Sequence, residues 1–167
     1  MIWALWLLGC PRPVPPEGQS GWQMAVPVAE ETPALAVESG VWRGDGVSVW
    51  VAPGWSGTHR TGPPETLELE DGETGTRLVV ELGPAALDLP RGCELLFEDT
   101  GTWRSVPLTD IRTASCVDES GALHRYWVGQ ADYVSVRLAA HYPMSGVVEA
   151  QHRVEEILST VTASAGG

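Results

Sequence analysis

The sequence contains no lysine, and all ten of its basic residues are arginine. The 22 acidic residues outnumber them, which gives a formal net charge of −12 at pH 7. A protein of this charge repels the phosphate backbone of nucleic acids. The composition therefore excludes nucleic acid from the expected partners.

Long apolar runs are also missing near the start of the chain. The first apolar segment, Ile2–Leu8, is far shorter than the ~20 residues that a membrane-spanning helix needs, and a small residue, Gly9, follows it. A short apolar segment that ends at a small residue is typical of a signal peptide. The alternative is that residues 1–9 form an apolar tail or edge strand that packs on the folded domain.

The end of this segment, Leu7-Leu8-Gly9-Cys10, resembles the lipobox of bacterial lipoproteins. The resemblance implies cleavage before Cys10, attachment of fatty acids such as palmitate to that residue, and a location in the cell envelope. By the same resemblance, Pro11 in place of aspartate favours the outer membrane, facing the periplasm or the cell surface. The expected partners are the membrane, through the lipid, and another envelope protein.

Cysteine is scarce, with three residues in the chain. If Cys10 carries lipid, Cys93 and Cys116 remain, and in an oxidising compartment such a pair is expected to form a disulfide. The alternative is two unpaired, buried thiols. Neither cysteine has a histidine or further cysteine at the spacing of a zinc motif, so no metal site is expected from them.

The pattern along the chain predicts three parts: a signal peptide at 1–9, a lipidated, proline-rich tether at 10–36, and one globular domain at 37–164. Alternating apolar residues and turn residues predict strands in the domain. These cover Val47–Val51, Leu67–Glu70, Thr76–Leu82, Glu94–Phe97, Arg104–Leu108, Ile111–Val117, Leu123–Val128 and Tyr133–His141.

One helix is predicted, over Val147–Val161, with Ser145 as its N-cap. Its apolar residues, Ile157 and Leu158 among them, share one face, while Glu149, Arg153 and Glu156 are expected on a solvated outer face. A block of strands closed by one helix predicts an α+β domain, with the helix packed on one face of an antiparallel sheet.

Two segments of the domain resemble the PsbP-like family, which includes small bacterial lipoproteins of the DcrB type. They are the strand with its Pro-Gly-Trp ending at Gly46–Trp55 and the helix ending Glu156-Ile-Leu-Ser-Thr-Val161. The resemblance covers roughly residues 40–164 and implies an α/β/α sandwich. It implies little about function, because one fold serves many functions.

Motifs for catalysis and cofactors are missing as well. Gly54-Trp55-Ser56-Gly57-Thr58 has threonine where a nucleophile elbow has its second glycine. The four histidines are scattered along the chain, and no two of them are four residues apart, the spacing with which two histidines on one helix bind a metal ion. They are His59, His124, His141 and His152. The acids Glu65, Glu68, Glu70, Asp71 and Glu73 are expected to form a solvated face and turn. We therefore expect no enzyme, no metal site and no cofactor.

Tryptophan, in contrast, is abundant, with eight residues. Trp50 lies on the strand face opposite Val47, Val49 and Val51, so either both faces of its sheet are covered, which we favour, or it belongs to an apolar patch. Trp50, Trp55 and Trp103 are the candidate partner surface, because interfaces are rich in tryptophan. The expected function is a non-catalytic binding or adaptor module. The alternative is a binder of a small ligand or metal ion in a cleft of the same domain.

Overall fold

The computed structural model of the protein describes residues 34–84, 89, 91–92, 94–100 and 108–163, all within one unit that spans residues 31–167. The predicted signal peptide, Cys10, most of the tether, Cys93, Trp103 and residues 104–107 of one predicted strand lie outside the described residues.

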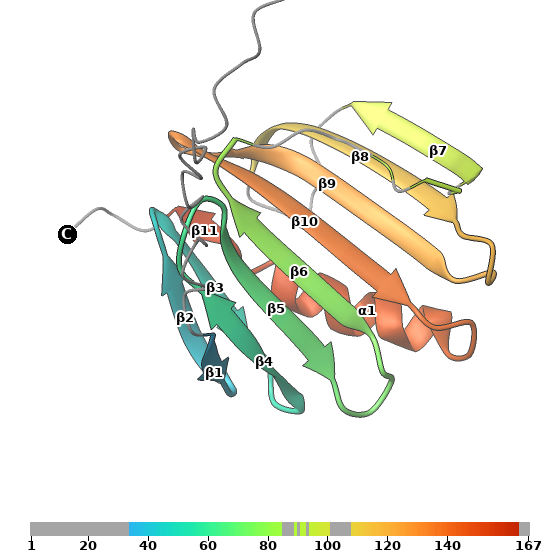
Figure 1. The fold of residues 1–167 in the computed structure, drawn as a ribbon, viewed down its shortest axis with the longest axis horizontal. Helices are drawn as coiled ribbons and strands as arrows, with labels where there is room; N and C mark the ends of the chain where they lie inside the picture. The colour runs from blue at the N-terminus through green and yellow to red at the C-terminus, as the bar shows by residue number, and fades with distance from the viewer. Residues whose placement is uncertain (1–33, 85–88, 90, 93, 101–107, 164–167) are drawn as a thin grey trace, which may run out of the picture. The chain divides into compact units, whose positions relative to one another are not determined.

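Eight strands form one large sheet in the order β1-β4-β5-β6-β10-β9-β8-β7, and each strand is antiparallel to its neighbours (Figure 1). Their bounds are β1 Leu35–Val37, β4 Trp55–Arg60, β5 Glu65–Asp71, β6 Arg77–Leu82, β7 Glu94–Thr100, β8 Thr109–Val117, β9 Leu123–Ala131 and β10 Val134–Tyr142.

Three further strands form a second, smaller sheet in the order β11-β3-β2. They are β2 Gly40–Gly44, β3 Val47–Val51 and β11 Thr162–Ala163. Val47, Val49 and Val51 of β3 are fully buried, whereas Ser48 and Trp50 between them are half-buried. One face of the small sheet therefore contributes to the core.

The single described helix, α1 Val147–Leu158, lies behind the large sheet in the view of Figure 1. Its N-cap is Gly146, with φ of 77°, and no side chain caps it, so the predicted Ser145 cap is wrong. Glycine adopts this left-handed conformation without steric cost. The helix ends at Leu158, before the predicted Val161. Beyond it, the Thr160 hydroxyl accepts a hydrogen bond of 3.0 Å from the Trp50 backbone N–H, which connects this part of the chain to β3.

The hydrophobic core includes side chains of both sheets and of α1. Alternate residues of β5, β6 and β10 supply most of the large sheet's part, and Trp55 of β4, Ile111 of β8 and Trp127 and Ala131 of β9 add to it. From α1, the residues in the core are Ala150, Val154, Ile157 and Leu158. The domain is therefore α+β, built on an antiparallel sheet with one described helix.

The strongest strand predictions are confirmed, including the hairpin of β5 and β6 and the strands β3, β8, β9 and β10. Four short strands, β1, β2, β4 and β11, were not predicted. β1 also corrects the predicted tether boundary, because Leu35 and Ala36 pair with His59 and Thr58 of β4. The folded domain thus begins before residue 37.

The largest correction concerns Asp71 and Arg153, which were both expected in solvent. The Asp71 side chain is completely buried, and its Oδ1 accepts a hydrogen bond of 2.6 Å from Nη2 of Arg153. Asp71 alternates with Leu67 and Leu69 on the core face of β5, so its carboxylate points inward. Arg153, 23% exposed, reaches it from α1.

Two further contacts hold this buried carboxylate. The Thr74 hydroxyl and backbone N–H donate to Asp71 Oδ2 at 2.7 and 3.2 Å. Burial pushes the pKa of Asp71 upward, but the hydrogen bonds from Thr74 and Arg153 outweigh it and leave the pKa below its usual value. The pair therefore joins α1 to the β5–β6 turn as a charged contact.

Candidate metal site

The β9–β10 hairpin brings two histidines together. A two-residue turn, Asp132-Tyr133, joins the strands, and Asp132 adopts a positive φ of 56° that aspartate tolerates better than most residues. In the register that follows, His141 lies directly opposite His124. His141 alternates with Ala140 and Tyr142, which belong to the core shared with α1, so both histidines lie on the sheet face away from α1.

The two imidazole rings are in contact. The Nδ1 atoms of His124 and His141 are 3.3 Å apart, and the ring centroids are 4.5 Å apart. His124 also stacks on Tyr126, two residues along the same strand, with the ring planes 7° from parallel. Both histidines are half-buried, so their rings are packed yet reachable from solvent.

Asp118, which precedes the β8–β9 turn, orients His124. Its Oδ2 lies 2.8 Å from Nε2 of His124. Its Oδ1 accepts hydrogen bonds from the Ser120 backbone N–H, the Ser120 hydroxyl and the Ala122 N–H, at 2.8, 2.6 and 3.1 Å. The hydrogen bond from the Ser120 hydroxyl, followed by that from His124, sets the pKa of Asp118 well below its usual value, so the carboxylate is charged.

This charge fixes the roles of the ring nitrogens. A charged carboxylate only accepts hydrogen bonds, so Nε2 of His124 donates and, in the neutral ring, its Nδ1 carries a lone pair. Nδ1 of His141 lies 3.3 Å from this nitrogen, within hydrogen-bonding distance. Burial lowers the pKa of His141, and the neighbouring His124 lowers it further.

The spacing of the two Nδ1 atoms suits a metal ion. Two nitrogens bound at 2.0–2.1 Å to a tetrahedral Zn²⁺ are about 3.3–3.4 Å apart, and the observed separation is 3.3 Å. Asp118, His124 and His141 offer ligand atoms that all lie within 4.8 Å of one another. Because both oxygens of Asp118 already accept hydrogen bonds, we assign it the outer-sphere role that often supports a metal-binding histidine.

A hollow of about 550 Å³ is lined by both histidines, which lie on the face of the large sheet away from α1. Charged and aromatic side chains of β5, β6, β9 and β10 line it beside the rings. They are Glu68, Arg77, Glu81, Tyr126 and Arg137. Arg137 forms an ion pair with Glu81, and its guanidinium carbon lies 5.6 Å from the centroid of the Tyr126 ring.

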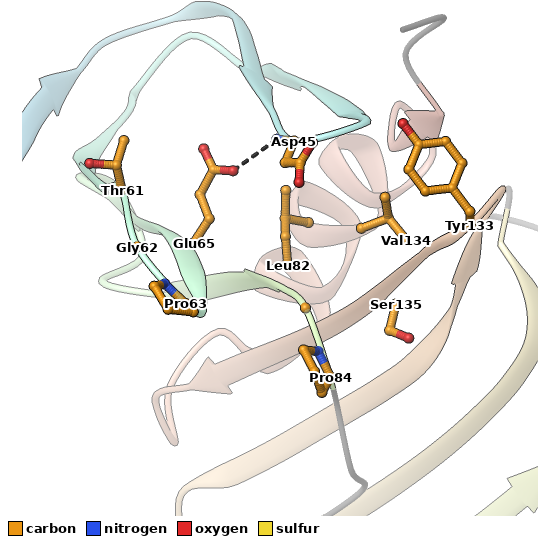
Figure 2. A pocket seen from close by; sticks show the side chains of 11 residues that line it. Asp45, Thr61, Gly62, Pro63, Glu65, Leu82, Pro84, Tyr133, Val134 and Ser135 are labelled. Atoms are coloured by element: carbon orange, nitrogen blue, oxygen red, sulfur yellow. Dashed lines mark hydrogen bonds between the residues drawn. The ribbon is translucent and has the colours of Figure 1, made fainter.

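A second hollow, of about 730 Å³, lies beside the β2–β3 turn (Figure 2). Glu65 on its wall accepts a hydrogen bond of 2.8 Å from the Asp45 backbone N–H, and its other oxygen lies 2.7 Å from Nε2 of His59. Ser135 accepts one from Gln130. No histidine or cysteine is among the described residues that line this hollow, so the histidine pair is the stronger candidate for a metal site.

The remaining predicted site residues are dispersed. Trp55 is 2% exposed and belongs to the core, so it cannot form part of a partner surface, and Trp50 is half-buried against the core. Ser56, for which no catalytic role is expected, is exposed on β4 and does not lie at a strand-to-helix turn. Cys116 is buried in β8, opposite His124 in register. Because Cys93 lies outside the described residues, the predicted disulfide stays a prediction.

The sequence contains a signal for the histidine pair that does not depend on helical i, i+4 spacing. His124 is eight residues before Asp132, and His141 is eight residues after Tyr133. In a hairpin with a two-residue turn, residues equally distant from the turn lie opposite each other. The expectation that these two histidines are scattered is therefore wrong, whereas His59 and His152 do lie elsewhere.

The comparisons with known proteins give no family for this chain. No protein-family model matches it, and no curated protein matches it. The one helix among the described residues is too short to cross a membrane. The geometry of the histidine pair is therefore the basis for a proposed function.

Proposed function

We propose that this protein binds a divalent transition-metal ion, Zn²⁺ in the first place, through Nδ1 of His124 and Nδ1 of His141. The observation that carries the proposal is the 3.3 Å separation of these two atoms, with Nε2 of His124 held by the Asp118 carboxylate. We propose binding without catalysis. Of the two functions expected from the sequence, the histidine pair favours the binding of a metal ion over the role of an adaptor for another protein.

The ligand set indicates the class of metal. Imidazole nitrogen is a good ligand for Zn²⁺, Cu²⁺ and Ni²⁺, whereas Ca²⁺ and Mg²⁺ prefer oxygen. The Asp118–His124 contact is the carboxylate–histidine arrangement that fixes the tautomer of a metal-binding ring. Zn²⁺ also accepts the tetrahedral angle that the nitrogen separation requires.

Asp118→Asn is expected to weaken Zn²⁺ binding by about 10- to 100-fold, because the amide no longer fixes the His124 ring. His141→Gln is expected to remove binding, since it deletes a ligand. Calorimetric titration of the folded protein with Zn²⁺ measures both, and His152→Gln, on an exposed part of α1, is the control that should match the unchanged protein. A wild-type protein without saturable binding, or a His152→Gln variant as weak as His141→Gln, would contradict the proposal.

The cell envelope as its location is a second part of the proposal. It is supported by the likeness of Leu7-Leu8-Gly9-Cys10 to a lipobox and by the proline-rich segment that follows. The PsbP-like α/β/α sandwich remains a proposal too. It is supported by the α+β fold and by the four residues of α1 in the core, while the described residues include a single helix.

Cys10→Ser is expected to move the protein from the membrane fraction to the soluble fraction, or to block its processing. Several acyl chains, at ~0.8 kcal/mol per buried CH₂, hold a protein on a membrane far more firmly than one chain does. Fractionation of the native host with mass spectrometry of the N-terminus measures this. A soluble wild-type protein that retains Met1 would overturn the anchor.

An adaptor role for another envelope protein is the second candidate function. Val41 of β2 and Trp50 of β3 are opposite each other in register, so they share the outer face of the small sheet, and Val41 is 55% exposed. We propose this apolar pair as the contact for a protein partner. Crosslinking in the native envelope, compared between wild type and Trp50→Ala, tests it.

A further inference from the structure

We infer that the metal-loaded site binds a small organic carboxylate, held between the metal ion and the guanidinium of Arg77. This inference rests on the proposed function and adds the class of ligand that the bound metal ion would take. A tetrahedral ion with two histidine ligands keeps two positions open, and both histidines line the hollow on the sheet face away from α1.

Arg77 is the cation placed to meet such a ligand. It lies directly opposite His141 in the β6–β10 register, so its side chain starts from the neighbouring position on the same face. Its nearest ion-pair contact, to Glu68, is a loose 3.6 Å, and its side chain is 59% exposed. Arg137, in contrast, is already engaged by Glu81 and by the Tyr126 ring.

The charges around the site favour a single negative charge on the ligand. In the lining of the hollow, Arg77 and Arg137 balance Glu68 and Glu81. The charges that remain are those of the metal ion and of Asp118, which lies outside the lining and contacts Nε2 of His124. A divalent cation beside one charged carboxylate has a net charge of about +1, and a metal ion is the largest local charge in its site. A carboxylate neutralises this excess and can also pair with a guanidinium in a two-pronged geometry.

The hollow has room for a small organic molecule. Ala139 lies between Tyr126 and Val79 in the register of the sheet, and its small side chain leaves space above the strand. The volume of about 550 Å³ falls in the usual range for small-molecule sites, about 300–1,000 Å³. The Tyr126 ring, stacked with His124, gives the hollow an aromatic wall.

Benzoate is the probe for this site, because it joins one carboxylate to one aromatic ring. The full chain is loaded with Co²⁺, whose visible spectrum reports its ligands, and is titrated with benzoate. We expect a saturable spectral change in the wild-type protein. Arg77→Met is expected to weaken benzoate binding by about tenfold or more, the usual effect of losing a charged hydrogen bond, while Co²⁺ affinity stays unchanged.

Arg60→Met is the matched control. Arg60 also pairs with Glu68, at 3.8 Å, and is 58% exposed, but it does not line this hollow. Benzoate should bind to this variant as it binds to the wild type. Failure to bind Co²⁺ would overturn the proposed function and this inference with it. Co²⁺ binding without a response to benzoate, or an equal response in Arg77→Met, would overturn the inference alone.

Discussion

Arg153→Ala is expected to lower the free energy of unfolding by about 3–5 kcal/mol, the usual cost of removing one partner of a buried ion pair. The carboxylate of Asp71 has no exposed surface, and Nη2 of Arg153 donates to it at 2.6 Å. The truncation leaves that charge buried beside only Thr74. Urea denaturation followed by tryptophan fluorescence measures the loss.

Glu149→Ala is the control for this prediction. Glu149 is exposed on the same helix, and its replacement is expected to change the free energy of unfolding by less than about 0.5 kcal/mol. Equal small effects of the two substitutions would show that Arg153 is solvated, and the buried contact with Asp71 would then be wrong.

The same contact predicts a dependence on pH. The folded pKa of Asp71 lies below its unfolded value of about 3.9. Its contribution to stability is therefore complete above about pH 4 to 5 and is lost as the pH falls through the folded pKa. The difference in unfolding free energy between wild type and Arg153→Ala should shrink as the pH falls below this range, because a protonated Asp71 no longer needs a cation. A constant difference would argue against the pair.

Leu158→Ala is expected to lower the free energy of unfolding by about 2–5 kcal/mol, through lost apolar burial and the cavity left behind. Leu158 has no exposed surface and belongs to the core shared by both sheets. Such a loss is a large part of the total stability of a typical domain, about 5–15 kcal/mol. Thermal and urea unfolding of the purified variant measure it.

Val148→Ala is the matched control on the same helix. Val148 is 69% exposed, so its replacement removes almost no buried surface and should change stability by less than about 0.5 kcal/mol. A larger loss in Val148→Ala than in Leu158→Ala would mean that α1 is rotated and presents its other face to the sheet.

Local pattern was enough to predict much of the fold. The alternation of Val47, Val49 and Val51 predicted β3, and the glycine-containing turn at 71–75 predicted the β5–β6 hairpin, because both signals lie within a few residues. β4 was missed because Gly57, Thr58 and His59 show no apolar alternation. Its strand conformation depends on pairing with β5, which is a tertiary effect.

The polar contacts of the domain were harder to predict. Helical spacing placed Arg153 among the solvated residues, and only the fold brings it to Asp71, 82 positions away in the chain. The His124–His141 contact, by comparison, follows from the β9–β10 register. The equal distance of the two histidines from the turn at Asp132-Tyr133 is enough to predict this contact from the sequence.

The most direct test of the metal site is a zinc-soaked crystal with diffraction data collected on both sides of the zinc absorption edge. We predict an anomalous peak between Nδ1 of His124 and Nδ1 of His141, about 2.0–2.1 Å from each nitrogen, with Asp118 still bound to Nε2 of His124. A peak at His59 or His152 alone, or no peak between the two Nδ1 atoms at saturating zinc, would contradict the proposed function.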